Sequence, residues 1–113
     1  MKIGSVSKET GIGIHAIRFY EKQGLIKTPQ KDSSGHRVYS PDDVELINWI
    51  ACMKNSGMSL SRIQEYSRAY YQQDSARCLD LLTEHLNHLT EQQSNLEHFI
   101  DVTKNKITGL KKS

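Results

Sequence analysis

Residues 11–24 read GIGIHAIRFYEKQG, and they give the first indication of the fold. The glycine-rich start of this stretch separates two short helices, one predicted over residues 5–10 with Ser5 as its N-cap and one predicted over residues 14–23. The second helix should end at Gly24, because glycine takes the left-handed conformation that commonly closes helices. The stretch therefore predicts two helices joined by a tight turn.

The two sides of the second helix differ in chemistry. Ile14, Ile17 and, a turn later, Leu25 or Ile26 supply an apolar side that we expect to be buried. His15, Arg18 and Lys22 are spaced by three and four residues, so they share another side, which we expect to face solvent. Two short helices of which the second exposes a basic stripe are typical of the helix-turn-helix motif. Many helical hairpins share this pattern, so the residues that follow are needed to support it.

Residues 25–39 are predicted to form a β-hairpin. Residues 25–29 are a short extended run that ends at a proline, a polar turn follows, and residues 36–39 alternate polar and apolar side chains. A two-stranded ribbon is marginal alone, so we expect it to lie against the helices as a wing. Arg37 and Tyr39 would share one face of this wing, where a guanidinium and a phenol suit contact with phosphates.

A second helix pair is predicted over residues 41–70. Ser40 as N-cap and a proline at the first helical position begin a helix over residues 41–55. Ser59 caps a further helix that runs from residue 60 to about residue 70. The side chains expected to be buried are Val44, Ile47, Ile50, Ala51, Leu60, Ile63 and Tyr66.

Residues 75–112 predict one long helix with heptad spacing. Its apolar seam is Leu79, Leu82, Leu86, Leu89, Leu96, Ile100, Ile107 and Leu110, and Gln93 and Thr103 interrupt it. Such a narrow stripe over about 50 Å needs a partner helix, and the simplest partner is the same helix of a second copy. The alternative is a long helix that folds back on its own domain. His85, His88 and His98 are expected to face solvent, since a lone pair three residues apart is a poor metal site.

The composition excludes several classes of protein. Apolar residues make up 36% of the 113 residues, and the net charge of +2 is too balanced for a bulk polycation. Residues 1–40 hold seven basic and three acidic side chains, a net +4, so the positive charge is concentrated at one end. Two cysteines and no apolar run of membrane-spanning length favour a soluble protein of the reducing cytoplasm. We expect no enzyme, no metal and no cofactor, because paired carboxylates, an organised nucleophile and a phosphate-binding glycine loop are absent from the sequence.

In this order, the motifs resemble those of the MerR family of bacterial transcription regulators. The resemblance covers residues 1–70 and is carried by IG (residues 3–4), TG (10–11), IRFYE (17–21), GLI (24–26), GHRVY (35–39) and GMSL (57–60). It implies a mainly α fold in which a winged helix-turn-helix DNA-binding domain with a small β-hairpin wing precedes a long C-terminal coiled-coil dimerisation helix. It also implies an antiparallel, two-fold pairing of that helix, a palindromic operator in double-stranded promoter DNA and RNA polymerase at the promoter.

The resemblance assigns roles to individual residues. Arg18 and Tyr20 would grip the DNA backbone, and Arg37 and Tyr39 would hold adjacent phosphates. His15 is the best candidate for touching a base edge, because the N-terminal end of a recognition helix sits deepest in the groove. The alternative is packing in the core for the two tyrosines and a solvated surface for the two arginines.

One position departs from the family pattern. Phe19 stands where the family often has tyrosine, and the lost hydroxyl removes a group that could bind phosphate. We therefore assign no DNA contact to Phe19.

The two cysteines, Cys52 and Cys78, are the candidates for a group that triggers regulation. Since the sequence ends at Ser113, we expect neither a ligand-binding domain nor a metal-binding cysteine loop. Cys52 resembles the single cysteine of the family branch that responds to aldehydes and other electrophiles, and a cation such as Lys54, Arg62 or a residue of the other subunit would have to favour its thiolate. The alternatives are a small buried core residue for Cys52, and for Cys78 either inert packing or a second thiol.

The sequence is also compatible with two other functions. One is a constitutive or architectural regulator of the same fold, in which Cys52 has no role. The other is a protein–protein adaptor that uses the coiled coil for partner helices. Steep salt dependence of binding to duplex DNA would separate a regulator from an adaptor.

Overall fold

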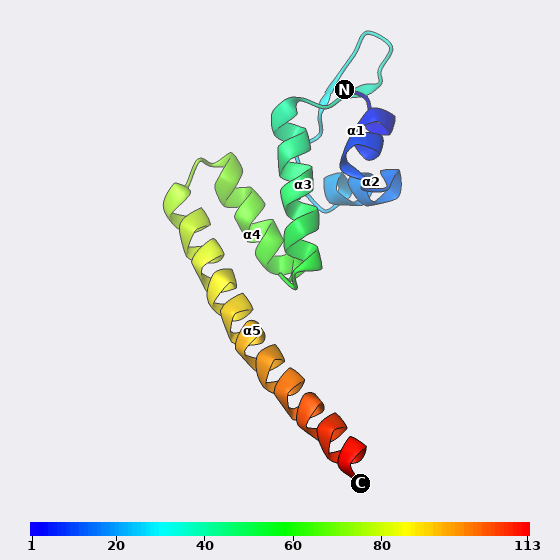
Figure 1. Ribbon diagram of the computed structural model, residues 1–113. Coiled ribbons are helices and arrows are strands. Elements are labelled where there is room, and N and C mark those ends of the chain that lie inside the picture. Colours follow the sequence, from blue (N-terminus) through cyan, green and yellow to red (C-terminus); the bar gives the residue numbers. More distant parts are fainter. The chain divides into compact units, whose positions relative to one another are not determined.

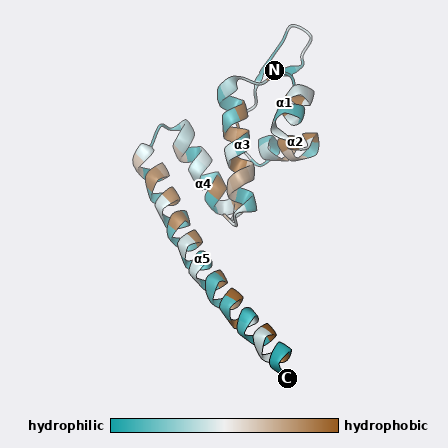
Figure 2. Cartoon of the chain, viewed as in Figure 1, coloured by the Kyte–Doolittle hydropathy of each residue, from teal (hydrophilic) through white to brown (hydrophobic).

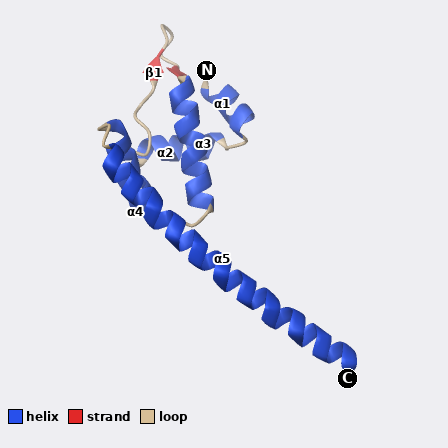
Figure 3. Ribbon diagram, turned by 60° about the vertical axis from the view of Figure 1, so that its left-hand side comes forward, coloured by secondary structure: helices blue, strands red, loops and turns tan.

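The structure is a computed structural model that describes residues 1–113. It contains helices and one two-stranded sheet (Figures 1 and 3), as the sequence predicts. The elements are α1 (Ile3–Thr10), α2 (Ile14–Lys22), β1 (Gln30–Lys31), β2 (Arg37–Val38), α3 (Pro41–Asn55), α4 (Leu60–Tyr71) and α5 (Ser75–Lys112). The chain divides into two compact units, Met1–Cys78 and Leu79–Ser113.

Helix α1 begins earlier than predicted. Its N-cap is Lys2 rather than Ser5, and no side chain caps it. The amide of Val6 donates to the carbonyl of Lys2 at 3.0 Å, and Val6 is fully buried. Packing of Val6 into the core and of Ile3 against it therefore outweighs the capping preference of serine.

The wing is shorter than predicted. The antiparallel pair joins Gln30 to Val38 and Lys31 to Arg37. Leu25 and Ile26 are not in a strand but are buried in the core. The prediction of an extended strand over residues 25–29 was wrong, because these apolar residues close the core behind α2 instead of pairing.

Helices α3 and α4 begin where the sequence predicts. Ser40 and Asp43 form a reciprocal capping box: Asp43 N–H donates to Ser40 Oγ at 3.1 Å, and Ser40 N–H donates to Asp43 Oδ2 at 2.9 Å. The hydroxyl of Ser59 accepts from the amide of Arg62 at 3.2 Å. These local bonds satisfy amides that a helix leaves without an intrahelical partner.

A single core holds the first unit together. Its buried members are Val6, Ile17, Tyr20, Leu25, Ile26, Tyr39, Leu46, Ile47, Ile50, Met58 and Ile63. The prediction missed Leu46, which is buried, and wrongly expected Leu60 to be buried, since it is 42% exposed. Tyr66 is half-buried and stacks on Trp49 with ring centroids 3.9 Å apart.

Helix α5 is one continuous helix, and apolar residues recur along it (Figure 2). Its buried residues are Leu81 and His85, the latter 8% exposed. The expectation that His85 faces solvent was wrong, because the heptad pattern describes one side of the helix, and Leu81 and His85, four residues apart, share another. Despite its length, α5 is not apolar enough to cross a membrane, and neither is any other helix.

Candidate nucleic-acid interface

Helix α2 has a buried side and an exposed side. Ile17 and Tyr20 are buried in the core. His15, Arg18 and Lys22 are exposed, in agreement with the spacing of three and four. The core therefore holds α2 so that its basic stripe faces solvent.

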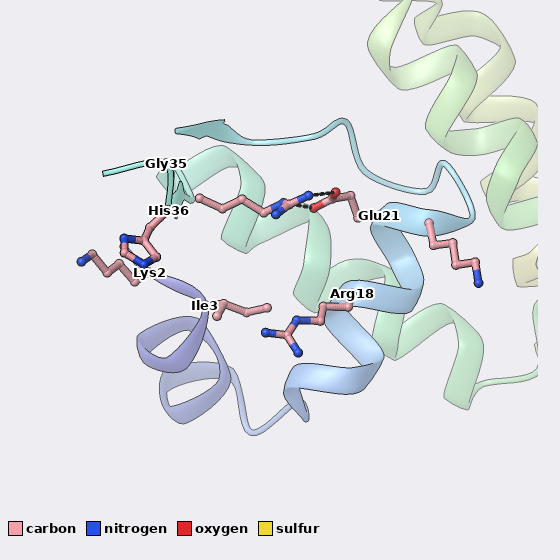
Figure 4. A pocket seen from close by; sticks show the side chains of 8 residues that line it. Lys2, Ile3, Arg18, Glu21, Gly35 and His36 are labelled. Atoms are coloured by element: carbon pink, nitrogen blue, oxygen red, sulfur yellow. Dashed lines mark hydrogen bonds and ion pairs between the residues drawn. The ribbon is translucent and has the colours of Figure 1, made fainter. Parts of the chain in front are cut away.

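A hollow of about 570 Å³ lies beside this stripe. Its lining comes from the start of the chain, α2 and the hairpin (Figure 4): Lys2, Ile3, Arg18, Glu21, Lys22, Gly35, His36 and Arg37. Four of these side chains are basic and one is acidic. The hollow thus brings cations that are distant in sequence to one place, which suits an anionic ligand.

An ion pair joins α2 to the wing across this hollow. The Nε and Nη2 atoms of Arg37 donate to the two carboxylate oxygens of Glu21 at 2.8 and 2.9 Å. The hydrogen bond to Glu21 raises the pKa of the Arg37 guanidinium above its ordinary value. The sequence placed Arg37 on the wing but did not predict Glu21 as its partner.

Tyr20 and Tyr39 lie in the core rather than on the surface. Their exposed fractions are 3% and 2%, and burial raises the pKa of both phenols. The hydroxyl of Tyr39 is shielded from solvent and has no hydrogen-bond partner. In this conformation Tyr39 cannot reach a phosphate, so its predicted contact is replaced by a packing role, the alternative considered from the sequence.

Two further residues extend the exposed surface of α2. Phe19 is 40% exposed, and the amino group of Lys54 from α3 lies 6.0 Å from the centre of its ring. From the sequence, Lys54 is expected only as a cation that could favour the thiolate of Cys52. No sequence signal placed this lysine beside the helix-turn-helix, because that proximity arises from packing between α2 and α3.

The turn of the wing is organised by one carboxylate. Asp32 Oδ1 accepts hydrogen bonds from the amides of Ser34 and His36, each at 2.9 Å. The bond from His36 is the main reason that the pKa of Asp32 is lowered. The loop between β1 and β2 therefore has a defined local conformation, and it presents His36 and Arg37 to the hollow.

Comparison with known proteins agrees with this geometry. The family model described as "MerR HTH family regulatory protein" matches residues 1–70. The chain belongs to the MerR family. It is 35% identical over 112 residues to the transcriptional regulator YfmP of Bacillus subtilis, and this match covers 95% of the chain and 80% of YfmP.

Two solved structures share the fold of this MerR-family chain. A MerR-family regulator from Bacillus thuringiensis superposes with a TM-score of 0.81 at 26% identity, with 96% of each chain covered. HiNmlR, a MerR-family regulator that lacks the sensor domain and was solved bound to promoter DNA, superposes with a TM-score of 0.83 at 24% identity. That match covers 95% of this chain and 86% of HiNmlR. The relatives in this family are regulators and not enzymes, as expected.

The two cysteines of this MerR-family chain differ in environment. Cys52 is exposed on α3, so the alternative of a buried core cysteine does not hold. Cys78 is half-buried, and burial together with the carboxylate of Asp74 raises the pKa of its thiol. Lys54 lies over Phe19 and Arg62 pairs with Glu65 at 3.2 Å, so both cations suggested for Cys52 make other contacts.

The predicted seam of α5 is largely accessible in the single chain. Leu82 and Leu89 are half-buried, and the other six are exposed: Leu79, Leu86, Leu96, Ile100, Ile107 and Leu110. Phe99 and Val102, which the heptad reading did not include, are also more than half exposed. A helix with this much accessible apolar surface is typical of an element that pairs with another helix.

Proposed function

We propose that this chain binds double-stranded promoter DNA through α2 and the wing. The observation that carries the proposal is the exposed basic stripe of α2, beside a hollow that Arg37 of the wing completes. His15 would meet a base edge in the major groove, and Arg18, Lys22 and Arg37 would hold phosphates. Tyr20, which is buried in the core, would hold α2 in place. The fold shared with HiNmlR supports this reading.

Salt-dependent binding tests this proposal. Fluorescence anisotropy of a labelled duplex from the region upstream of the chain's own coding sequence should give an affinity that falls steeply between about 50 and 200 mM salt. Arg18→Ala and Lys22→Ala should each reduce the salt slope by about one. Lys104→Ala, an exposed site on α5, is the matched control and should leave the slope unchanged. Binding without a salt slope would favour the adaptor function instead.

The active species is proposed to be a homodimer. The exposed seam of α5 supports this, because a stripe from Leu79 to Leu110 leaves apolar side chains in water until a second helix covers them. Antiparallel pairing of two α5 helices would relate two α2 helices by a two-fold axis, so the operator would be palindromic. Sedimentation equilibrium should give twice the mass of the 12.9 kDa chain.

Regulation is proposed to act through DNA distortion. The dimer would bind a promoter whose spacer is too long for RNA polymerase, and bending and untwisting of the centre would bring both promoter elements into register. In vitro transcription from promoters with spacers of different lengths tests this. Activation only with the long spacer supports it, whereas activation that does not depend on spacer length contradicts it.

The trigger is proposed to be covalent modification of Cys52. Its exposure on α3 supports this, because an aldehyde or oxidant must reach the sulfur atom. A change in α3 would alter the position of the DNA-binding elements that pack on it. Transcription with Cys52→Ser should lose induction by aldehyde and keep DNA binding. Unchanged induction would leave a constitutive or architectural regulator of the same fold.

A further inference from the structure

Glu21 is the one acidic side chain among the residues that line the basic hollow. Lys2, Arg18, Lys22 and Arg37 line the same hollow (Figure 4). The Glu21 side chain is only 16% exposed. If charge alone decided DNA affinity, a carboxylate here would repel phosphates and weaken binding. If Glu21 favours DNA binding, it must do so through its contacts with other side chains and not through its charge.

The geometry of the ion pair between Glu21 and Arg37 provides such a contact. Glu21 engages the Nε and Nη2 edge of the Arg37 guanidinium with both of its oxygens. A guanidinium has five N–H groups in a rigid plane, so this contact uses two of them and leaves three, including both on Nη1. A second anion can bind the remaining edge while Glu21 stays in place.

The pair also joins two separate elements. Glu21 is on α2, which the core holds through Ile17 and Tyr20. Arg37 is on β2, in a hairpin of only two residues per strand. Arg37 is 42% exposed, and a free arginine side chain loses rotamer entropy when it is held in one conformation. The contact with Glu21 restrains the guanidinium before any ligand arrives.

We propose that Glu21 is a positioning residue for phosphate binding by Arg37. It holds one edge of the guanidinium against α2 so that the Nη1 edge faces the DNA backbone. This inference rests on the proposed DNA-binding function. The rival role is competition, in which Glu21 occupies Arg37 and must release it before phosphate binds.

The two roles predict opposite signs for one substitution. Glu21→Gln removes a negative charge from the interface and disrupts the bidentate pair. Positioning predicts that DNA binding weakens by three- to ten-fold although the protein gains a positive charge. Competition predicts that binding tightens and that the salt slope becomes steeper.

The test compares Glu21→Gln with Glu45→Gln, which removes the same charge from an exposed site on α3. Affinities are measured by anisotropy with the upstream duplex described above, and thermal melting checks that each variant folds. In an Arg37→Ala background, Glu21→Gln should no longer weaken binding, because there is no guanidinium left to position. If Glu21→Gln does not fold, Glu21→Asp, which keeps the charge but withdraws the carboxylate, should weaken binding in the same way.

The outcomes separate this inference from the proposed function. Binding by the wild-type chain, with an equal or higher affinity for Glu21→Gln, overturns the positioning role and leaves the DNA-binding function intact. An equal loss for Glu21→Gln with and without Arg37 also overturns it, since the effect would then not pass through the arginine. No salt-dependent binding by the wild-type chain overturns both.

Discussion

The first unit, Met1–Cys78, and the second, Leu79–Ser113, treat their apolar side chains in opposite ways. The first unit encloses its aliphatic residues: Val6, Ile17, Ile47 and Ile50 have no exposed surface. In the second unit, Leu86, Leu96 and Leu110 are about 60% exposed. The difference shows that an overall apolar content of 36% does not indicate which part of the chain encloses a core of its own. One region has a core of its own, whereas the other leaves its apolar side chains accessible in the single chain.

The largest expected effect is in the core of the first unit. Ile47→Ala should lower the free energy of unfolding by about 2–5 kcal/mol, because a fully buried side chain leaves a cavity. Urea denaturation followed by circular dichroism measures this. Thr28→Ala, an exposed site in the same unit, is the control. A loss below about 1 kcal/mol would contradict the view that this unit has a tightly packed core of its own.

The next largest effect is expected in the second unit. It should change the association of two chains and not the folding of the single chain. Leu96→Lys together with Ile100→Lys places two charges on the exposed seam and should convert the proposed dimer to a monomer. Sedimentation equilibrium over a range of concentrations measures this. Glu97→Lys, which lies off the seam, is the control. A double-lysine variant that still dimerises would place the interface elsewhere.

A local effect concerns the capping box of α3. Ser40→Ala removes the side chain that accepts from the amide of Asp43 and should cost about 1 kcal/mol of stability. Thermal melting measures it. Ser34→Ala, in the exposed turn of the wing, provides a serine control whose side chain caps no helix. Equal stability of the two variants would mean that packing alone determines where α3 begins.

The two cysteines allow a finer comparison between α3 and the start of α5. Cys52 should react with iodoacetamide roughly ten-fold faster than Cys78 at neutral pH, since the raised pKa and partial burial of Cys78 keep it protonated and shielded. Mass spectrometry of tryptic peptides over time measures both rates in one sample. Faster labelling of Cys78 would move the candidate sensor to α5.

The smallest expected effect is electrostatic and lies at the end of the first unit. Hydrogen bonding to Arg77 lowers the pKa of Glu65 below its ordinary value of 4.5. The folded state therefore gains stability from this carboxylate above that pH, and the gain is lost as the pH falls through the lowered pKa. Glu65→Gln should lower the melting temperature slightly at pH 7 and by less at pH 3. An equal decrease at both pH values would contradict the ionic origin.

The sequence predicted those features that depend on neighbouring residues. The starts of α3 and α4 followed from Ser40 and Ser59, whose side chains bond to amides three residues later. The family motifs between residues 1 and 70 identified the helix-turn-helix and its basic stripe. Where long-range packing competes with a local preference, prediction failed: α1 begins before Ser5, and no strand forms over residues 25–29.

The order of the helices, the hairpin between them and the exposed basic side of α2 could be predicted from the sequence, because these features follow from spacing and short-range bonds. The resemblance to the family followed from its short motifs. Packing between separate elements was needed to establish that Tyr20 and Tyr39 are core residues, that Lys54 lies beside Phe19 and that Glu21 pairs with Arg37. Glu21 and Arg37 are sixteen residues apart in sequence. Periodicity along one element cannot predict such contacts, since they form only when separate elements pack around a common core.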